Sequence, residues 1–358
     1  MTLLLWTGLD KNNLFNDPFN WAPPTAPNSS SDCFITSSTS AAIDAGNTTI
    51  NSLSITNAGA TLSIASTAAF TLLGAPDSTN STGASANDGT ILMGSFGDLN
   101  LDGGFANFGT LNTAAGSDVS VNSAFVNDGL VLQYGDFTVG VGHMGTVVND
   151  PGRNWFIAGA ADISAGGAPL SSFTNAGTLA RTGAGVTDVS VATANTGLVE
   201  AVNGGRLEFS SPVANFGTMA ASGAVLKVDR PVSGTGGLNI ETNAAGAGGT
   251  VNIVRGSDAG QTVDFLASFA TKTPEKLDLN SASTFAGHIS GFGFAGTDLI
   301  DLVNTFANNA AYNPFNDVLT LSNTFTGATV ANLHFNGSYT TSDFHLTATA
   351  AGTQISFV

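Results

Sequence analysis

The sequence predicts an all-β fold, a right-handed parallel β-helix (β-solenoid) with coils of roughly 20 residues. Three observations favour it: an Asn-x-Gly triplet that recurs every 20 residues, apolar residues that alternate with polar ones around each copy, and a low content of charge. Repeats of this length are typical of solenoids, in which each unit buries its apolar residues against the units above and below it.

The Asn-x-Gly triplet forms two sets of three copies. They begin at Asn87, Asn107 and Asn127, and at Asn175, Asn195 and Asn215, with 20 residues between neighbours in each set. We expect the Gly to adopt the positive φ of a corner between two faces. The Asn is expected to cap backbone groups in the corner and to hydrogen-bond to the Asn of the next coil, as Asn ladders do in cross-β assemblies.

Apolar residues around each triplet follow the period of two that is typical of strands. Phe105 precedes Asn107 and Leu111 follows it, and the pair Val119 and Val121 comes about a dozen residues later. Equivalent strands one coil apart would lie parallel, at about 4.8 Å from each other.

Composition divides the chain into three regions. Residues 1–36 hold two of the three Trp residues and a cluster of Pro, which predicts a cap over the first coil and a candidate assembly segment. Residues 37–284 are predicted to form the solenoid, interrupted by loops at 74–86 and 142–172. Residues 285–358 are predicted to form a C-terminal β segment, with a hairpin turn at Asn336-Gly337.

Charge and cysteine content exclude several classes of partner. The net charge is −17, with only 9 Lys and Arg, so neither nucleic acid nor an anionic membrane surface is an expected partner. No apolar run is long enough to insert into a membrane. Cys33 is the single cysteine, which leaves no disulfide framework. The many Asp residues suit exposed bends; scattered Ca²⁺ binding between bends is the alternative, and no other cofactor is expected.

Catalytic motifs are missing from the sequence. It has no Gly-x-Ser-x-Gly, phosphate loop or dinucleotide fingerprint, and its four His residues lack a ligand spacing, although a hairpin would bring His334 near His345. We therefore expect no enzyme and no catalytic, cofactor-binding or metal-binding residues. The alternative is a polysaccharide-degrading β-helix, which requires two carboxylates that face each other in a groove.

Loops that project from a solenoid are the expected place for binding. Within the 142–172 loop, Trp155 and Arg153 are the candidate ligand contacts, which would suit an adhesin or a carbohydrate-binding protein. The structural alternative is that Trp155 covers the side of a coil.

Two segments resemble known families of exported proteins. The pattern Trp6-x-Gly8, then Asn20-Trp21, a Pro pair and Asp32, resembles the start of bacterial secreted β-strand-repeat proteins. Near the other end, Ile-Ser-Gly-Phe at 289–292 with Asp-Leu-Ile-Asp-Leu at 298–302 resembles the C-terminal segments of proteins exported by type I secretion. Such segments carry an uncleaved export signal, which would agree with the absence of a signal peptide at the start of the sequence. The Gly-Gly-x-Gly-x-Asp calcium nonapeptide of many such proteins is missing.

The sequence therefore predicts a non-enzymatic structural protein of the bacterial cell surface or extracellular (biofilm) matrix. Its expected partner is a further copy of itself, joined head to tail into a filament, because a contact that does not close on itself produces an open polymer. Extracellular polysaccharide is the second candidate partner. A strand donated from residues 1–36 or 340–358 would form the joint, and the candidate assembly contacts are Trp6, Phe15, Phe19, Trp21 and Phe357.

Overall fold

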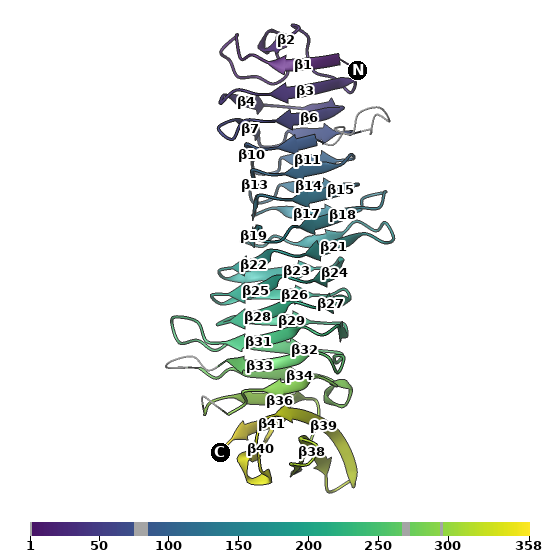
Figure 1. Ribbon diagram of the computed structural model, residues 1–358, viewed down its shortest axis with the longest axis vertical. Coiled ribbons are helices and arrows are strands. Elements are labelled where there is room, and N and C mark those ends of the chain that lie inside the picture. The colour runs from purple at the N-terminus through teal and green to yellow at the C-terminus, as the bar shows by residue number, and fades with distance from the viewer. Residues whose placement is uncertain (1, 75–84, 267–272, 294–295) are drawn as a thin grey trace. The chain divides into compact units, whose positions relative to one another are not determined.

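A computed structural model describes residues 2–74, 85–266, 273–293 and 296–358, whose regular structure is almost entirely β-strand. The chain divides into two compact units, the first formed by Met1–Leu179 with Ser190–Ala192 and the second by Ala180–Val189 with Thr193–Val358. In each unit successive coils supply strands to three sheets, and nearly all neighbouring strands are parallel (Figure 1). The predicted parallel β-solenoid is confirmed.

In the first unit each sheet follows the order of the coils. The first sheet comprises β2 (Trp21–Ala22), β1 (Thr2–Trp6), β3 (Ser31–Ile35), β6 (Ser52–Ile55), β9 (Ser85–Asn87), β12 (Phe105–Asn107), β15 (Ala124–Asn127), β18 (Thr146–Asn149) and β21 (Ser172–Asn175). The second comprises β4 (Ser40–Ile43), β7 (Thr61–Ile64), β10 (Thr90–Met93), β13 (Thr110–Asn112), β16 (Leu130–Gln133) and β19 (Asn154–Ile157). The third comprises β5 (Asn47–Ile50), β8 (Ala69–Leu72), β11 (Asp98–Leu101), β14 (Asp118–Val121), β17 (Asp136–Val139) and β20 (Ile163–Ala165).

The second unit repeats this arrangement and ends in antiparallel strands. Its first sheet contains β27 (Val213–Asn215) and β30 (Val232–Ser233). Two strands cross the unit boundary: β24 (Ala192–Asn195) of the first sheet and β22 (Thr178–Thr182) of the second. The second sheet comprises β25 (Leu198–Val202), β28 (Thr218–Ser222), β31 (Gly237–Glu241), β33 (Thr262–Leu266), β35 (His288–Ser290), β39 (Ala328–Asn336), β38 (Val318–Asn323) and β37 (Asn309–Asn313). The third comprises β23 (Gly185–Val189), β26 (Gly205–Phe209), β29 (Val225–Val228), β32 (Thr250–Ile253), β34 (Lys276–Leu279), β36 (Leu299–Val303), β41 (Gly352–Phe357) and β40 (Phe344–Thr349). Single-turn 3₁₀ helices occur at η1 (Pro18–Asn20), η2 (Ala282–Thr284) and η3 (Thr341–Asp343).

The core of each unit follows from the alternation seen in the sequence. Residues one coil apart pair in register, so that inward-facing apolar residues stack on apolar residues of the next coil. Phe105, for example, lies opposite Phe125, with ring centroids 5.8 Å apart. Both side chains are almost fully buried. Because the strand period is two, the intervening residues face outward.

The glycines of the Asn-x-Gly corners serve a different purpose from the one predicted. Neither Gly109 nor Gly129 has a positive φ. A Cβ on Gly109 would lie 2.0 Å from the carbonyl oxygen of Gly89, and one on Gly129 would lie 2.2 Å from that of Gly109. The prediction of a positive φ was wrong, and the physical reason for Gly is the close approach of stacked backbones.

The predicted loop at 142–172 differs from the structure. The 142–172 segment contains strands β18, β19 and β20, so it is a complete coil rather than an insertion. In the 74–86 segment, Ser85 and Ala86 belong to strand β9, and residues 75–84 lie outside the described residues. A longer coil interrupts the sequence period, but the strands keep their register because only the turns lengthen.

The ends of the chain depart from the repeat. Strand β1 joins the first sheet in parallel with β3, and Trp6, Phe15 and Trp21 pack together beside it, in agreement with an aromatic cap. In the C-terminal segment, β38 pairs with β37 and β39, and β40 pairs with β41, all antiparallel. The predicted hairpin at Asn336-Gly337 is wrong, because β39 and β40, which flank it, belong to different sheets.

We predict that Gly109→Ala destabilises the fold by about 1–3 kcal/mol, because the added methyl overpacks two backbones that cannot separate locally. A lower urea midpoint than that of the wild type would show this. The matched control is Gly237→Ala, whose Cβ would find only an ordinary contact at 3.5 Å with the side chain of Asn239. An equal loss in both variants would contradict the close-approach explanation.

Candidate functional site

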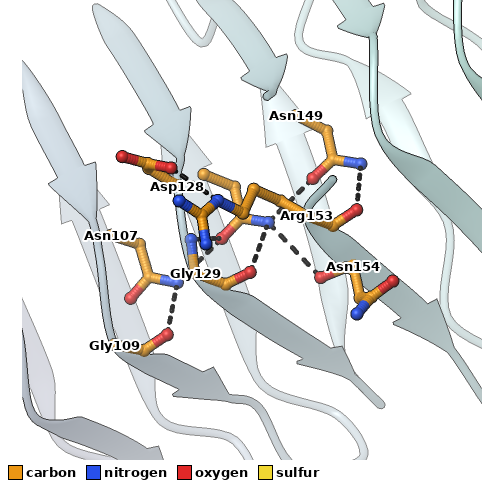
Figure 2. A network of polar contacts seen from close by, with 8 residues as sticks. Asn107, Gly109, Asp128, Gly129, Asn149, Arg153 and Asn154 are labelled. Atoms are coloured by element: carbon orange, nitrogen blue, oxygen red, sulfur yellow. Dashed lines mark hydrogen bonds and ion pairs between the residues drawn. The ribbon is translucent and has the colours of Figure 1, made fainter. Parts of the chain in front are cut away.

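Buried asparagines form a continuous hydrogen-bonded ladder in the first unit. The Nδ2 atom of each donates to Oδ1 of the next: Asn87 to Asn107 at 2.8 Å, Asn107 to Asn127 at 2.9 Å, Asn127 to Asn149 at 2.8 Å and Asn149 to Asn175 at 2.8 Å. Figure 2 shows part of this network from close by. The predicted ladder is confirmed.

Each ladder amide also serves the backbone of the corner. The Nδ2 atom of Asn127 reaches the carbonyl oxygens of Gly129 at 3.5 Å and Asn154 at 3.3 Å, and its Oδ1 accepts from the amide of Gly129 at 3.3 Å. The side chain has no exposed surface. Since its polar atoms are bonded internally, the Asn holds neighbouring coils together and offers nothing to a ligand.

Two ladder residues were missed from the sequence. Asn149 is followed by Asp-Pro-Gly instead of completing an Asn-x-Gly triplet, yet Val147 stands two positions before it, as Phe125 stands before Asn127. In the second unit Asn195 donates to Asn215 at 2.9 Å, and Asn215 donates to Oε1 of Gln261 at 3.1 Å. The apolar residue before Asn149 was the available signal; nothing in the period points to Gln261.

The structure contradicts the predicted ligand contact at Trp155. Its side chain is fully buried, because β19 pairs in register with β16 and places Trp155 beside the inward-facing Val131. The indole Nε1 donates to Oε1 of Gln133 at 2.7 Å, and the ring lies 4.8 Å from that of Phe137. Trp155 is therefore part of the core.

Arg153 lies at the surface next to the ladder. Its side chain is 45% exposed, and Nε lies 2.6 Å from Oδ1 of Asp128, the variable residue of an Asn-x-Gly corner (Figure 2). An exposed ion pair of this kind contributes little to stability. Without Trp155 beside it on the surface, Arg153 does not form the predicted two-residue contact.

Most of the predicted assembly contacts are buried. Trp6, Phe15 and Trp21 have at most 2% exposed surface, and Trp21 Nε1 donates to the carbonyl oxygen of Phe15 at 2.6 Å. These three cannot contact another copy while the cap is folded, which corrects the prediction. Phe19 is 67% exposed and stays a candidate. Phe357 is half-buried.

Phe357 lines a shallow groove of about 380 Å³ in the second unit. Phe292 and Tyr339 form its apolar part, and Asn336 and Ser338 its polar part. The hydroxyl of Tyr339 donates to the carbonyl oxygen of Phe292 at 3.0 Å, which fixes the ring. The groove lies where β35 and β39 end.

Ion pairs run along the outward face of the third sheet in the second unit. Lys227 lies 2.6 Å from Glu208 and 2.8 Å from Asp229. Lys276 lies 3.0 Å from Asp278 and 3.3 Å from Asp301, two carboxylates on adjacent strands.

Asp278 and Asp301 pair in register on adjacent strands, so they were considered as the paired carboxylates that a glycosidase requires. Burial raises the pKa of Asp278, and Lys276 opposes this shift. The ammonium group of Lys276 lies against both carboxylates and offsets one of their two negative charges.

A second pair of carboxyl groups lies inside the second unit. Glu275 and Asp298 are at most 1% exposed, so a substrate does not reach them. Burial raises the pKa of Glu275 to about 7, with a further contribution from the negative charge of Asp298. The hydroxyl of Thr242 donates to Oε1 of Glu275 at 2.8 Å and partly opposes the shift.

Metal-ligand clusters and membrane-spanning helices were sought in the described part of the chain. It contains no group of three or more His, Cys, Asp or Glu side chains that could hold a metal ion. None of its helices has the length and apolar character needed to cross a bilayer.

In comparisons with known proteins, no family model, no curated protein and no solved structure matches this chain. The functional argument therefore depends on the residues and their geometry.

We expect Asn127→Ala to lower the free energy of unfolding by at least about 2 kcal/mol, because it leaves the amide of Asn107 and the carbonyl of Asn149 without their partners in a buried site. Chemical denaturation followed by circular dichroism measures this. Asn100→Ala removes an outward-facing Asn with one 3.4 Å contact to Thr71, and should change stability by less than about 0.5 kcal/mol. A ladder variant as stable as this control would refute a structural role for the ladder.

Stability should fall as the pH rises through about 7, the pKa of folded Glu275. Its ordinary pKa is 4.5, so the folded state binds the proton more tightly; the stabilisation is complete below about pH 4.5 and is lost as the folded carboxyl ionises. We expect Glu275→Gln to reduce the stability difference between pH 5 and pH 8 by about 1–3 kcal/mol, measured by urea denaturation at both values. An unchanged difference would assign the pH dependence to other groups.

Proposed function

We propose that this chain is a non-enzymatic extracellular structural protein whose copies join end to end through open sheet edges. The observation that carries the proposal is that strands β5 and β40, at the edges of the third sheets of the first and second units, contain no charged residue and no Pro. Proteins that stay monomeric commonly protect such edges with Lys, Pro or a covering segment.

Strand β5 is the less protected edge of the first unit. Beside it, β4 is covered by the segment around Leu14, which bridges to Ala42, and Phe15 donates a backbone hydrogen bond to Ala42 at 2.7 Å. On β5 the corresponding contact is a side-chain one, between Asn16 and Thr48 at 2.8 Å. Among the described residues, β5 pairs with β8 alone.

Strand β40 offers a complementary edge in the second unit. It runs antiparallel to β41, and β41 runs antiparallel to β36, so β40 has the same direction as the parallel strands of its own sheet. A further parallel strand from another copy would therefore continue the sheet without a reversal. Strand β37 is less accessible, since the amide of Tyr312 on it donates to the hydroxyl of Thr341 at 3.0 Å.

Of the two segments predicted to form the joint, the proposal uses residues 340–358, which contain β40. Residues 1–36 then serve as a cap. Backbone hydrogen bonds along a sheet edge provide affinity without specific side-chain chemistry. A joint between two different edges is heterologous and does not close, so it produces a filament.

The resemblance to exported proteins supports an extracellular, bacterial location. Its residues at 289–292 and 298–302 fall in β35, the turn after it, and β36, and they belong to the folded second unit. A surface with few charges and many Ser, Thr and Asn residues also suits a structural protein packed against copies of itself.

The two alternatives have less support. An adhesin that binds carbohydrate through Trp155 loses its aromatic contact, because Trp155 is in the core. A polysaccharide-degrading enzyme would need accessible paired carboxylates, whereas Glu275 and Asp298 are buried. The carboxylates of Asp278 and Asp301 are engaged in ion pairs with Lys276.

We expect Thr347→Lys in β40 and Thr49→Lys in β5 each to shorten or abolish filaments of the purified full chain in negative-stain electron microscopy. A Lys side chain on either edge would place an uncompensated charge in the joint. Combining Thr49→Glu with Thr347→Lys should restore part of the assembly, since opposite charges then meet across the joint.

The control variant is Ser164→Lys, which adds the same charge on β20, an internal strand of the third sheet. It should assemble as the wild type does. Isolated particles of the wild-type chain at every concentration would refute the proposal, and filaments that tolerate both edge substitutions would exclude these edges as the joint.

A further inference from the structure

Two histidines far apart in the sequence lie side by side on the outward face of the second sheet. His288 on β35 pairs in parallel register with His334 on β39, and their ring centroids are 5.5 Å apart with the planes inclined by 55°. Both residues are half-buried. The sequence had instead suggested His334 and His345, which belong to strands of different sheets.

The separation of the rings matches joint coordination of one metal ion. With metal–nitrogen distances of about 2.0–2.1 Å and a tetrahedral angle, two bound imidazoles have centroids about 5.2 Å apart. The observed 5.5 Å is close to this separation. The planes are inclined to each other, so the rings are not stacked.

Oxygen ligands are available on the same face. Because side chains two positions apart in a strand share a face, Ser290 lies on the side of His288, and Asn336 on the side of His334. Ser290 and Asn336 pair in the same register and form the second row of a two-by-two polar array. Asn336 is exposed and also lines the groove beside Tyr339.

The residues that pair directly with the outer side of each histidine are uncharged, and Asp264 pairs with Ser290 in the next row. His288 has Thr262 on its other side in β33, and His334 has Val318 on its other side in β38. Neither imidazole has a hydrogen bond to another described residue, and the two rings lie next to each other. The imidazole pair is therefore available to a metal.

The geometry points to a Zn²⁺-binding site formed by His288 and His334, with Asn336 and water completing the coordination. Imidazole nitrogen suits Zn²⁺ and related transition metals, whereas Mg²⁺ and Ca²⁺ prefer sites built from oxygen. This site is independent of the proposed assembly through β5 and β40.

A metal bound here would reinforce the connection between the solenoid coils and the C-terminal antiparallel strands. Strand β35 pairs with β39 over only three residue pairs, and His288–His334 is one of them. A ligand from each strand would tie the two together, so binding would stabilise the folded second unit by mass action.

The test is isothermal titration calorimetry of the full-length chain, without an affinity tag, with ZnCl₂ and with MgCl₂. We expect one Zn²⁺ per chain and no heat of binding with Mg²⁺. The variants His288→Gln and His334→Gln should each abolish the Zn²⁺ isotherm while keeping the circular dichroism spectrum of the wild type. The matched control His345→Gln, on the exposed strand β40, should bind as the wild type does.

A thermal readout is independent of the calorimetric one. Excess Zn²⁺ should raise the unfolding temperature of the wild type and of His345→Gln, and should leave that of His288→Gln unchanged. No Zn²⁺ binding by the wild type, undiminished binding by either pair variant, or an equal loss in His345→Gln would overturn the assignment.

Discussion

The in-register stacking of one coil on the next is the constraint on which the rest of this structure depends. It brings buried amides such as those of Asn107 and Asn127 within 2.9 Å of each other, where each must hydrogen-bond to the next or remain unsatisfied. A shift of one residue in any strand would turn its apolar residues outward and break the ladder. The ladder and the apolar core therefore select the same register, and each supports the other.

The same stacking accounts for the composition of the corners. Where two coils approach closely, as at Gly89 and Gly109, a side chain would meet the carbonyl oxygen of the neighbouring coil. The Asn supplies hydrogen bonds at this corner, and the Gly supplies the space that they require. Polar residues inside a low-charge protein are thus explained by contacts between coils, without an external ligand.

A stack of coils leaves edges wherever it ends, and the two units treat them differently. In the first unit an aromatic cluster and the segment around Leu14 cover part of the end, while β5 is contacted there by the side chain of Asn16. In the second unit the strands turn antiparallel, and β40 remains at the edge. Strand β40 of the proposed joint and strand β39 of the proposed Zn²⁺ site both lie in the C-terminal segment, where the repeat ends.

The solenoid, the period of its coils and the Asn ladder could be predicted from the repeat, because a short repeat must bury equivalent residues in every coil. The sequence did not reveal that residues 142–172 form a coil, since longer turns hide the strands from a search by period. The burial of Trp155 beside Val131, the pairing of His288 with His334 and the edge position of β40 were decided by tertiary structure alone. Each depends on which strand lies next to which, and residues 46 positions apart carry no local signal of their contact.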